Sequence, residues 1–211
     1  MTVPERLILV GGGGHCKSCI EVVESTGGYE VYGILDVTDR IGDRVLGYPI
    51  IGSDRMIPEL VSQGFCFLVS LGQIKSSKPR RDLFGRLKRE GAHMATVIAA
   101  SARVSKHARI SPGTIVHHGC HVNAGAEVGE NCIINTGSNL EHDVIVMDHT
   151  HISTGCMLNG NASVGRDCFL GSGTIISNGV SIGDEVVVGA GSLILRSIRE
   201  KGTYVGLYNK K

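Results

Sequence analysis

Residues 134–153 read INTGSNLEHDVIVMDHTHIS, and every sixth position of this stretch carries an aliphatic side chain. The spacing continues in both directions. Stepping by six from Val104 to Ile194 gives sixteen positions, and each of them is Val, Ile or Leu. An α-helix repeats its faces about every 3.6 residues and a β-strand about every 2 residues, so neither explains a period of six. A coil of short flat strands, each followed by a tight turn, does explain it.

A second column of residues supports this interpretation. The positions two residues before the aliphatic anchors are all small or β-branched: Ala108, Thr114, Cys120, Ala126, Cys132, Ser138, Val144, Thr150, Cys156, Ala162, Cys168, Thr174, Val180, Val186 and Ser192. Three hexapeptides make one triangular coil of roughly eighteen residues, and about five such coils stack into a parallel β-helix with the anchors inside. The cysteines of this column are interpreted as packed apolar thiols.

The first hundred residues predict a small α/β domain. An apolar strand over residues 5–10 is followed by Gly11-Gly12-Gly13-Gly14, a helix over HCKSCIEVVEST and a second strand that ends at Asp36. Glycines let backbone N–H groups approach a phosphate at a helix N-terminus. Asp36 is placed to accept a hydrogen bond from a ribose or a base. The dinucleotide fingerprint G-x-G-x-x-G is incomplete, because its last position is Cys16.

Three further segments lie between this unit and the β-helix. Residues 64–73, GFCFLVSLGQ, predict a strand, and residues 75–89 carry seven basic side chains on a predicted helix. That basic run is interpreted as a solvated face, with phosphate contact as the alternative. The segment ATVIAA, residues 95–100, predicts one more strand. We therefore expect a Rossmann-like α/β domain over residues 1–100, a β-helix over 101–195 and a tail over 196–211.

A cluster of titratable side chains interrupts the β-helical pattern. His142 lies two positions after an anchor, at or near a turn, so its side chain can face outward. Glu141 and Asp143 flank it, and a carboxylate beside an imidazole raises its basicity and fixes its tautomer. His151 follows nine residues later, within reach of the same cleft. The alternative is that His142 is a solvated turn residue.

Acyl transfer from a thioester to an amine suits this cluster. The amine must be neutral to attack, so one base must take its proton, and the oxyanion needs one donor. A covalent acyl-enzyme is unnecessary for this reaction, so the prediction needs no nucleophile elbow. Metal and redox sites are the competing interpretations: the C-x-x-C pair Cys16 and Cys19 has no second pair, and the spacings of the histidine pairs 117/121 and 149/151 give no zinc-like third ligand. We expect no metal.

Composition limits the possible partners and the location. The chain has 211 residues and a net charge of +1, so no strong field favours nucleic acid or an anionic membrane. Its first ten residues lack the signal-peptide pattern, and no run of about eighteen apolar residues occurs. We therefore expect a cytoplasmic protein.

The order of these segments resembles the hexapeptide-repeat acyltransferases, in particular the bacterial nucleotide-sugar N-acetyltransferases and the sialic acid O-acetyltransferases. The resemblance covers nearly the whole chain and is carried by GGGGH, ILD, INTG, EHD, HIS and YVG at residues 11–15, 34–36, 134–137, 141–143, 151–153 and 204–206. It implies a left-handed β-helix and a homotrimer with active sites between neighbouring subunits. Flat prism faces suit a closed three-fold ring.

The resemblance also implies roles for individual residues. In such enzymes the histidine matching His142 is the general base, and the acid matching Asp143 increases its basicity. The positions that meet the nucleotide-sugar match Gly13, Gly14, His15, Asp36, Gly72 and Asn135. The positions that meet acetyl-CoA match His151, Gly160, Ser172 and Ala190. The usual ending glycine-x-proline-alanine-lysine is Gly206-Leu207-Tyr208-Asn209-Lys210 here, without the proline.

These expectations define one function and its competitors. We expect an acetyl-CoA-dependent N-acetyltransferase that acts on the 4-amino group of a nucleotide-linked 4-amino-4,6-dideoxy sugar, with UDP, dTDP or GDP as the nucleotide. By the resemblance, its product would enter surface-polysaccharide or glycan synthesis. The alternatives are an O-acetyltransferase of a sialic-acid-like sugar and a non-catalytic solenoid that binds a nucleotide-sugar or a partner protein. A nicotinamide dehydrogenase is a further alternative.

Overall fold

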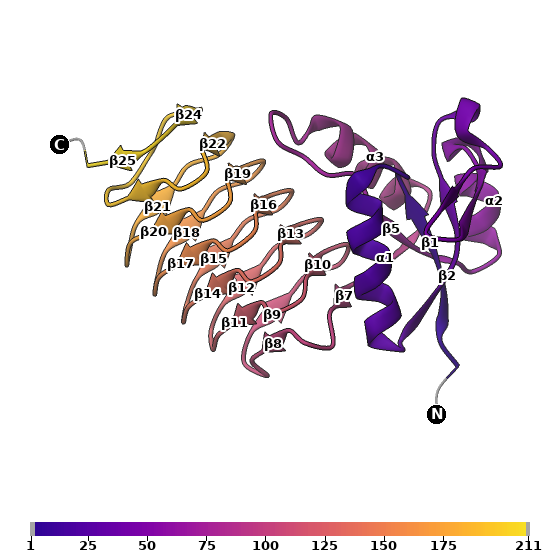
Figure 1. The fold of residues 1–211 in the computed structure, drawn as a ribbon, viewed down its shortest axis with the longest axis horizontal. Helices are drawn as coiled ribbons and strands as arrows, with labels where there is room; N and C mark the ends of the chain where they lie inside the picture. The colour runs from indigo at the N-terminus through magenta and orange to yellow at the C-terminus, as the bar shows by residue number, and fades with distance from the viewer. Residues whose placement is uncertain (1–2, 210–211) are drawn as a thin grey trace.

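The computed structural model describes residues 3–209 and consists of an α/β unit followed by a long stack of coils (Figure 1). The α/β unit holds a six-stranded sheet in the order β3-β4-β2-β1-β5-β6. Its strands are β1 (Glu5–Val10), β2 (Tyr29–Leu35), β3 (Arg44–Val45), β4 (Tyr48–Gly52), β5 (Cys66–Val69) and β6 (His93–Met94). Its helices are α1 (Gly14–Thr26), α2 (Ile57–Ser62) and α3 (Lys78–Arg89), with 3-10 turns at Thr38–Arg40 and Asp54–Met56.

Alternating side chains divide the core of this unit into two layers. Leu7 and Leu9 of β1 pack on one side of the sheet with Ile20 of α1, and the neighbouring residues Ile8 and Val10 pack on the other side with α2 and α3. The central strands are parallel and buried on both faces, which explains their continuous apolar sequences. The predicted strand, glycine turn, helix and strand are therefore present.

The coils form three flat faces, which we call faces 1, 2 and 3. Face 1 contains β7 (Val97–Ile98), β10 (Ile115–Val116), β13 (Ile133–Ile134), β16 (His151–Ile152), β19 (Phe169–Leu170), β22 (Val186–Val188) and β24 (Gly202–Tyr204). Face 2 contains β8 (Arg103–Val104), β11 (His121–Val122), β14 (Asn139–Leu140), β17 (Met157–Leu158), β20 (Ile175–Ile176), β23 (Leu193–Ile194) and β25 (Leu207–Tyr208). Face 3 contains β9 (Arg109–Ile110), β12 (Glu127–Val128), β15 (Ile145–Val146), β18 (Ser163–Val164) and β21 (Ser181–Ile182).

The register confirms the eighteen-residue coil. Val116 lies beside Ile134, and Ile134 lies beside Ile152, in a parallel ladder that repeats on each face. The anchors from Val116 to Ile194 are buried in one continuous core, together with the small column beside them. The expected left-handed parallel β-helix is thus the observed fold. Its ladders extend from Val97 to Tyr208, and Lys210 lies outside the described residues.

The turns show a feature that the sequence interpretation missed. Every sixth residue from Gly113 to Gly191 has a positive φ, between 55° and 75°. Eight of these positions are glycine, and the others include Asn131, Asp143 and Asn161. Glycine, asparagine and aspartate tolerate this left-handed conformation best. Glycines directly after anchors have a different cause: at Gly171 a Cβ would lie 2.5 Å from the backbone nitrogen of Ala190 in the next coil.

The α/β unit is fixed to the β-helix along the edge between faces 3 and 1. Ser77 and Arg81 both contact the carboxylate of Asp167, at 2.5 and 2.6 Å, and Lys88 pairs with Glu130 at 2.9 Å. The basic helix is therefore present, but it faces the β-helix as well as solvent. On the other side of the sheet, α1 contributes to a core that includes the outward side chains of face 1.

Two other sequence-based expectations meet the structure here. All seven cysteines are free and buried, and burial raises the pKa of the Cys16 thiol to about 11 and of the Cys19 thiol to about 12. A thiol held in its neutral form is a poor nucleophile, which argues against a redox role for the C-x-x-C pair. Among residues 3–209, no helix is both long enough and apolar enough to cross a bilayer.

Candidate active site

His142 stands on the edge between faces 2 and 3, in the turn that joins β14 to β15. Its side chain is 57% exposed, so it can meet a ligand from outside. The imidazole Nδ1 lies 2.9 Å from the Asp143 carboxylate, and Nδ1–H donates to Oδ2. This contact leaves Nε2 with its lone pair and directs it away from the acid. Asp143 occupies one of the left-handed turn positions, with φ 60°.

Gly160 lies beside this imidazole, one coil further along the same edge. A Cβ at this position would overlap Nε2 of His142. Gly160 is buried and its φ is not in the positive range, so the backbone itself does not require glycine here. The absence of a side chain instead gives the His142 ring its space. The structure thus brings together three predicted site residues: His142, Asp143 and Gly160.

A second group of histidines lies where α1 meets face 1. The ring of His15 is 5.4 Å from that of His117 and 6.2 Å from that of His151, measured between centroids. Burial is the main cause that lowers the pKa of His15 to about 2 and of His117 and His151 to about 4. All three rings are therefore neutral near pH 7. Nε2 of each ring is buried and has no hydrogen-bond partner among residues 3–209.

Gln73, which the sequence analysis did not single out, holds this group in place. Its side-chain Nε2 donates to the carbonyls of His149 and Cys168, at 2.9 and 3.0 Å. The backbone carbonyl of Gln73 accepts a hydrogen bond from Nδ1 of His151 at 2.8 Å, which leaves Nε2 of His151 as an acceptor. A single glutamine in a loop gives no sequence signal for such a role.

Arg80 is a second unforeseen member of this region. Its guanidinium is 1% exposed and donates to the carbonyls of Val69, Leu71 and Asn131, so it joins β5 and the following loop to the β-helix. Its positive charge contributes to the lowered pKa of His15 and His117. The guanidinium has no carboxylate partner among residues 3–209.

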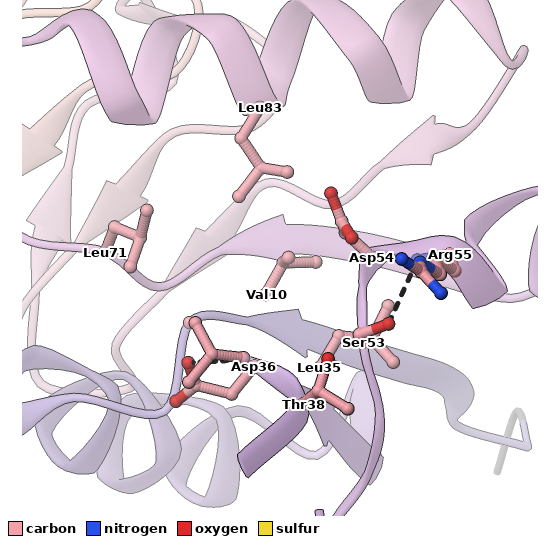
Figure 2. A pocket seen from close by; sticks show the side chains of 11 residues that line it. Val10, Leu35, Asp36, Thr38, Ser53, Asp54, Arg55, Leu71 and Leu83 are labelled. Atoms are coloured by element: carbon pink, nitrogen blue, oxygen red, sulfur yellow. Dashed lines mark hydrogen bonds between the residues drawn. The ribbon is translucent and has the colours of Figure 1, made fainter. Parts of the chain in front are cut away.

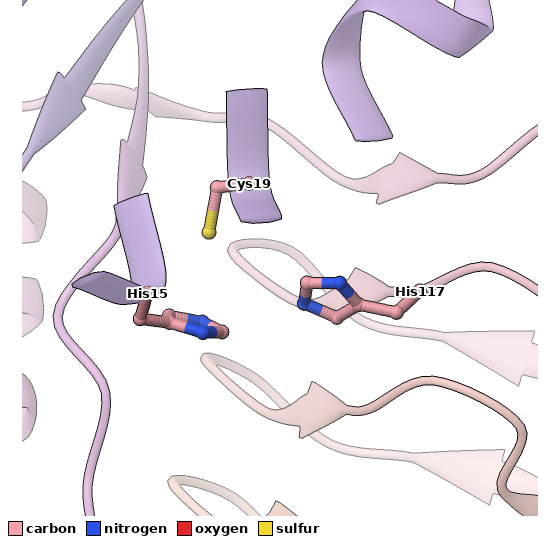
Figure 3. A group of neighbouring side chains, drawn as sticks. All are labelled: His15, Cys19 and His117. Carbon is pink, nitrogen blue, oxygen red and sulfur yellow. The ribbon is translucent and has the colours of Figure 1, made fainter. Parts of the chain in front are cut away.

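His15, Cys19 and His117 bring three potential metal ligands within 4.8 Å of one another (Figure 3). A dication here would sit in a buried region next to the unpaired charge of Arg80, and no acidic ligand would offset it. We therefore interpret these nitrogens as hydrogen-bonding groups for a polar organic ligand.

The glycine turn and Asp36 form the neighbouring part of the α/β unit. Gly13 is the N-cap of α1 and makes no side-chain cap, and both Gly13 and Gly14 are exposed. Asp36 accepts from the backbone N–H of Gly12 at 2.9 Å, from its neighbour Val37 at 2.7 Å and from Arg40 at 2.6 Å. The carboxylate thus orders the turn, and fewer of its lone pairs remain for a ribose than the sequence suggested.

A cavity of about 400 Å³ opens beside Asp36, at the carboxyl ends of β1 and β2 (Figure 2). Val10, Leu71 and Leu83 give it an apolar wall, and its other lining residues are Gly11, Leu35, Asp36, Val37, Thr38, Ser53, Asp54 and Arg55. This is where open α/β sheets bind ligands. Gly72 lies outside the cavity lining, but the position its Cβ would take is 3.4 Å from Cβ of His15.

The remaining predicted residues lie on the edge between faces 1 and 2. Asn135, Ser172 and Ala190 lie in turns of this edge, and the turn that holds Ser153 separates Asn135 from Ser172. Ser153 in the same column makes a 3.0 Å hydrogen bond to Ser172. Ser172 and Ala190 are exposed, and Asn135 is half-buried.

Within one chain these residues fall into two separate groups. His142, Asp143 and Gly160 occupy the edge between faces 2 and 3, which is opposite face 1 across the aliphatic core. His15, His117 and His151 lie on or beside face 1. The predicted base and the predicted nucleotide-binding residues are therefore not brought together within a single chain.

Comparisons with known proteins agree with this architecture. Residues 6–87 match the family described as PglD N-terminal domain, and residues 161–196 match the hexapeptide repeat of succinyl-transferase. A mutant of perosamine N-acetyltransferase from Caulobacter crescentus, solved with CoA and GDP-perosamine, is 32% identical with a TM-score of 0.89, over 97% of this chain and 95% of that chain.

Two other solved structures are similar along nearly their whole length. The acetyltransferase domain of PglB from Neisseria gonorrhoeae, solved with acetyl coenzyme A, is 29% identical with a TM-score of 0.89, over 96% of this chain and 97% of that chain. WeeI from Acinetobacter baumannii is 19% identical with a TM-score of 0.84, over 96% and 97%, and this likeness shows the fold alone.

The hexapeptide β-helix, the exposed imidazole–carboxylate pair on its edge and these similarities define an acyltransferase of the hexapeptide-repeat class. More particularly, the chain belongs to the family of bacterial sugar acetyltransferases that join a PglD-type N-terminal domain to such a β-helix.

Proposed function

We propose that this protein transfers the acetyl group of acetyl-CoA to the 4-amino group of a nucleotide-linked 4-amino-4,6-dideoxy sugar. The observation that carries the proposal is the His142–Asp143 pair: an exposed imidazole whose Nδ1 is held by a carboxylate at 2.9 Å and whose Nε2 has space beside Gly160. Such a pair is a general base that needs no covalent intermediate.

The chemistry follows from the free Nε2. The sugar ammonium loses a proton to Nε2 of His142, and the neutral amine attacks the thioester carbonyl. The carbon–sulfur bond breaks, the imidazolium returns its proton to the leaving thiolate, and the extra proton on the attacking nitrogen passes to water, which leaves a neutral amide. Asp143 holds the ring throughout and lies next to the positive charge that forms on it. His142 is exposed, so it meets both ligands only where they reach the edge between faces 2 and 3.

The nucleotide-sugar is proposed to bind at the α/β unit. The cavity at Asp36 has the position and the apolar wall for a base and ribose, and the exposed N-terminus of α1 at Gly13 and Gly14 offers backbone N–H groups to a diphosphate. The unpaired Nε2 atoms of His15 and His117 suit the hydroxyl groups of a sugar. Related enzymes bind GDP-perosamine together with CoA.

Acetyl-CoA is proposed to bind along the β-helix near His151, Gly160, Ser172 and Ala190. The exposed turns at Ser172 and Ala190 lie on one edge of face 2, and Gly160 lies on the other edge, beside the base. One similar structure holds acetyl coenzyme A. We place the reaction in the cytoplasm, where acetyl-CoA and nucleotide-sugars are both made.

A homotrimer would join the two groups of site residues. Met157, Ile175, Leu193 and Leu207 form a ladder of exposed apolar side chains on face 2, from 36% to 67% exposed. Face 2 is bounded by both edges that carry site residues. If face 2 points toward a three-fold axis, the His142 edge of each chain meets the Asn135 edge of the next chain, which makes three equal sites.

Replacement of His142 tests the proposal. His142→Ala is expected to lower kcat for acetyl transfer on the order of 100- to 10,000-fold without unfolding the protein, because the side chain is exposed and serves as the base. His107→Ala, at another exposed histidine, is the matched control. The measurement is thiol release from acetyl-CoA with a panel of UDP-, dTDP- and GDP-linked amino-sugars and with free sialic acids.

The outcomes separate the competing functions. Turnover with a nucleotide-linked amino-sugar that falls in His142→Ala supports the proposal. Turnover only with free sialic acids favours an O-acetyltransferase. Undiminished thiol release in a folded His142→Ala variant contradicts the role of His142, and no turnover with any substrate favours a non-catalytic binding protein.

A further inference from the structure

A second cluster of ligand-type side chains lies at the opposite end of the α/β sheet. Glu5, Cys66 and His93 come from three adjacent strands, β1, β5 and β6, and all stand near the amino ends of those strands. The glycine turn and the proposed nucleotide cavity lie at the carboxyl ends. Nothing in the proposed acetyl transfer uses these three residues.

The donor atoms of this cluster form a compact triangle. Sγ of Cys66 is 2.9 Å from Oε2 of Glu5 and 3.2 Å from Nδ1 of His93, and Nδ1 is 3.5 Å from Oε2. Tetrahedral zinc with thiolate, imidazole and carboxylate ligands separates its donor atoms by about 3.3 to 3.6 Å. The observed triangle therefore needs its donor atoms to shift by about 0.2 to 0.6 Å relative to one another to hold such an ion.

The scaffold and the charges also suit a dication. Cys66 pairs with His93 in the parallel ladder, and Leu7, two residues after Glu5, pairs with Cys66, so main-chain hydrogen bonds fix the spacing. One thiolate and one carboxylate would neutralise a divalent ion, unlike the group at Cys19, which has a buried guanidinium nearby and no acid. The side chains of Glu5 and His93 are 53% and 68% exposed, so solvent can supply a water as the fourth ligand.

We propose that Glu5, Cys66 and His93 bind a divalent transition-metal ion of the zinc type, which links the amino ends of three strands. On binding, the S–H bond of Cys66 breaks, its proton passes to the buffer, and a metal–sulfur bond forms. Glu5 supplies a carboxylate oxygen and His93 supplies the lone pair of Nδ1. The ion is structural and lies apart from the acetyl-transfer chemistry.

Cobalt(II) titration of the metal-free full-length protein tests this site. One Co²⁺ per chain is expected to produce the intense visible bands of a tetrahedral ion and a near-ultraviolet thiolate-to-cobalt band. Cys66→Ser is expected to remove the near-ultraviolet band. His93→Ala, a change at an exposed side chain, is expected to weaken binding on the order of 100-fold or more. Zn²⁺ is expected to raise Tm of the unaltered protein but not of His93→Ala.

Two matched variants complete the design. His107→Ala, at an exposed histidine elsewhere, and His117→Ala, from the other ligand cluster, are both expected to keep the cobalt spectrum. The inference is overturned if the unaltered protein gives no thiolate band, if the band survives in Cys66→Ser, or if His117→Ala removes it. If Cys66→Ser fails to fold, His93→Ala decides the question, since retention of tight tetrahedral binding there also overturns it.

Discussion

His142 and the group of His15, His117 and His151 place the same side chain in opposite surroundings. His142 is mostly exposed, and its Nδ1 is held by a carboxylate. His117 and His151 are buried and His15 is largely so; all three lie near Arg80 and have pKa values lowered to between about 2 and about 4. Burial without an acid keeps an imidazole neutral and makes it a hydrogen-bonding group, whereas exposure beside an acid leaves it free to accept a proton. The surroundings of a histidine, more than its residue type, therefore decide whether it can act as a base or as a hydrogen-bonding residue.

Filling the space beside His142 is expected to have the largest effect on kcat after removal of His142 itself. Gly160→Ala is expected to lower kcat on the order of 100-fold, because the new methyl group would displace the His142 ring from its position. Stability should change little, since the overlapping atom belongs to a side chain that can rotate. Steady-state kinetics and Tm measure the two effects. Gly28→Ala, where a Cβ meets nothing, is the control, and an unchanged kcat in Gly160→Ala would show that the ring position is unimportant.

The binding region can be tested at the helix N-terminus. Gly13→Asp places a carboxylate at the uncapped end of α1, where it is expected to stabilise the helix yet repel a diphosphate. We expect KM for the nucleotide-sugar to rise at least about tenfold while KM for acetyl-CoA and the fold remain unchanged. Gly13→Asn adds a capping side chain of similar size without a charge, so it separates electrostatic repulsion of the diphosphate from a steric effect. Equal KM values in all three proteins would place the diphosphate elsewhere.

The buried histidines predict a pH-dependent effect on stability. His117 titrates near 6.5 when unfolded and near 4 when folded, so its contribution is fully present above pH 6.5 and is lost as pH falls toward 4. The loss should reach about 3 kcal/mol at pH 4. Between these pH values, the free energy of unfolding measured in urea should therefore fall more steeply with decreasing pH in the unaltered protein than in His117→Asn. Parallel curves, as expected for the exposed control His107→Asn, would contradict the neutral buried state.

Sequence predicted the β-helix better than it predicted the site. The sixteen anchors gave the coil, and His142 faces outward as its place two residues after Leu140 indicated. The left-handed turn column also has a sequence signal, because glycine, asparagine and aspartate recur at it. Handedness came from family resemblance, since period alone does not determine it.

The contacts between the two parts of the chain had no sequence signal. Gln73 and Arg80 look like ordinary loop and helix residues, and only folding shows that they reach carbonyls far along the chain. The sequence analysis also missed the strands β3 and β4 and the helix α2. These elements, within residues 44–62, are short, and their sequences show no clear periodicity. The division of the chain at residues 100 and 195 and the roles of the individual site residues stay predictions.

A mixed-oligomer experiment tests the central claim most directly, namely that the base of one chain serves the nucleotide-sugar held by another. His142→Ala and Gly13→Asp chains carrying different tags are combined in equal amounts, and acetyl transfer is measured. With the nucleotide-sugar kept well below its KM, His142→Ala alone should be nearly inactive and Gly13→Asp alone should keep at most about a tenth of the unaltered activity. Random trimers should recover about one quarter of the unaltered activity, because one site in four pairs an intact base with an intact nucleotide site. No recovery in a verified mixed oligomer would contradict the account, because it would mean that each site lies within a single chain.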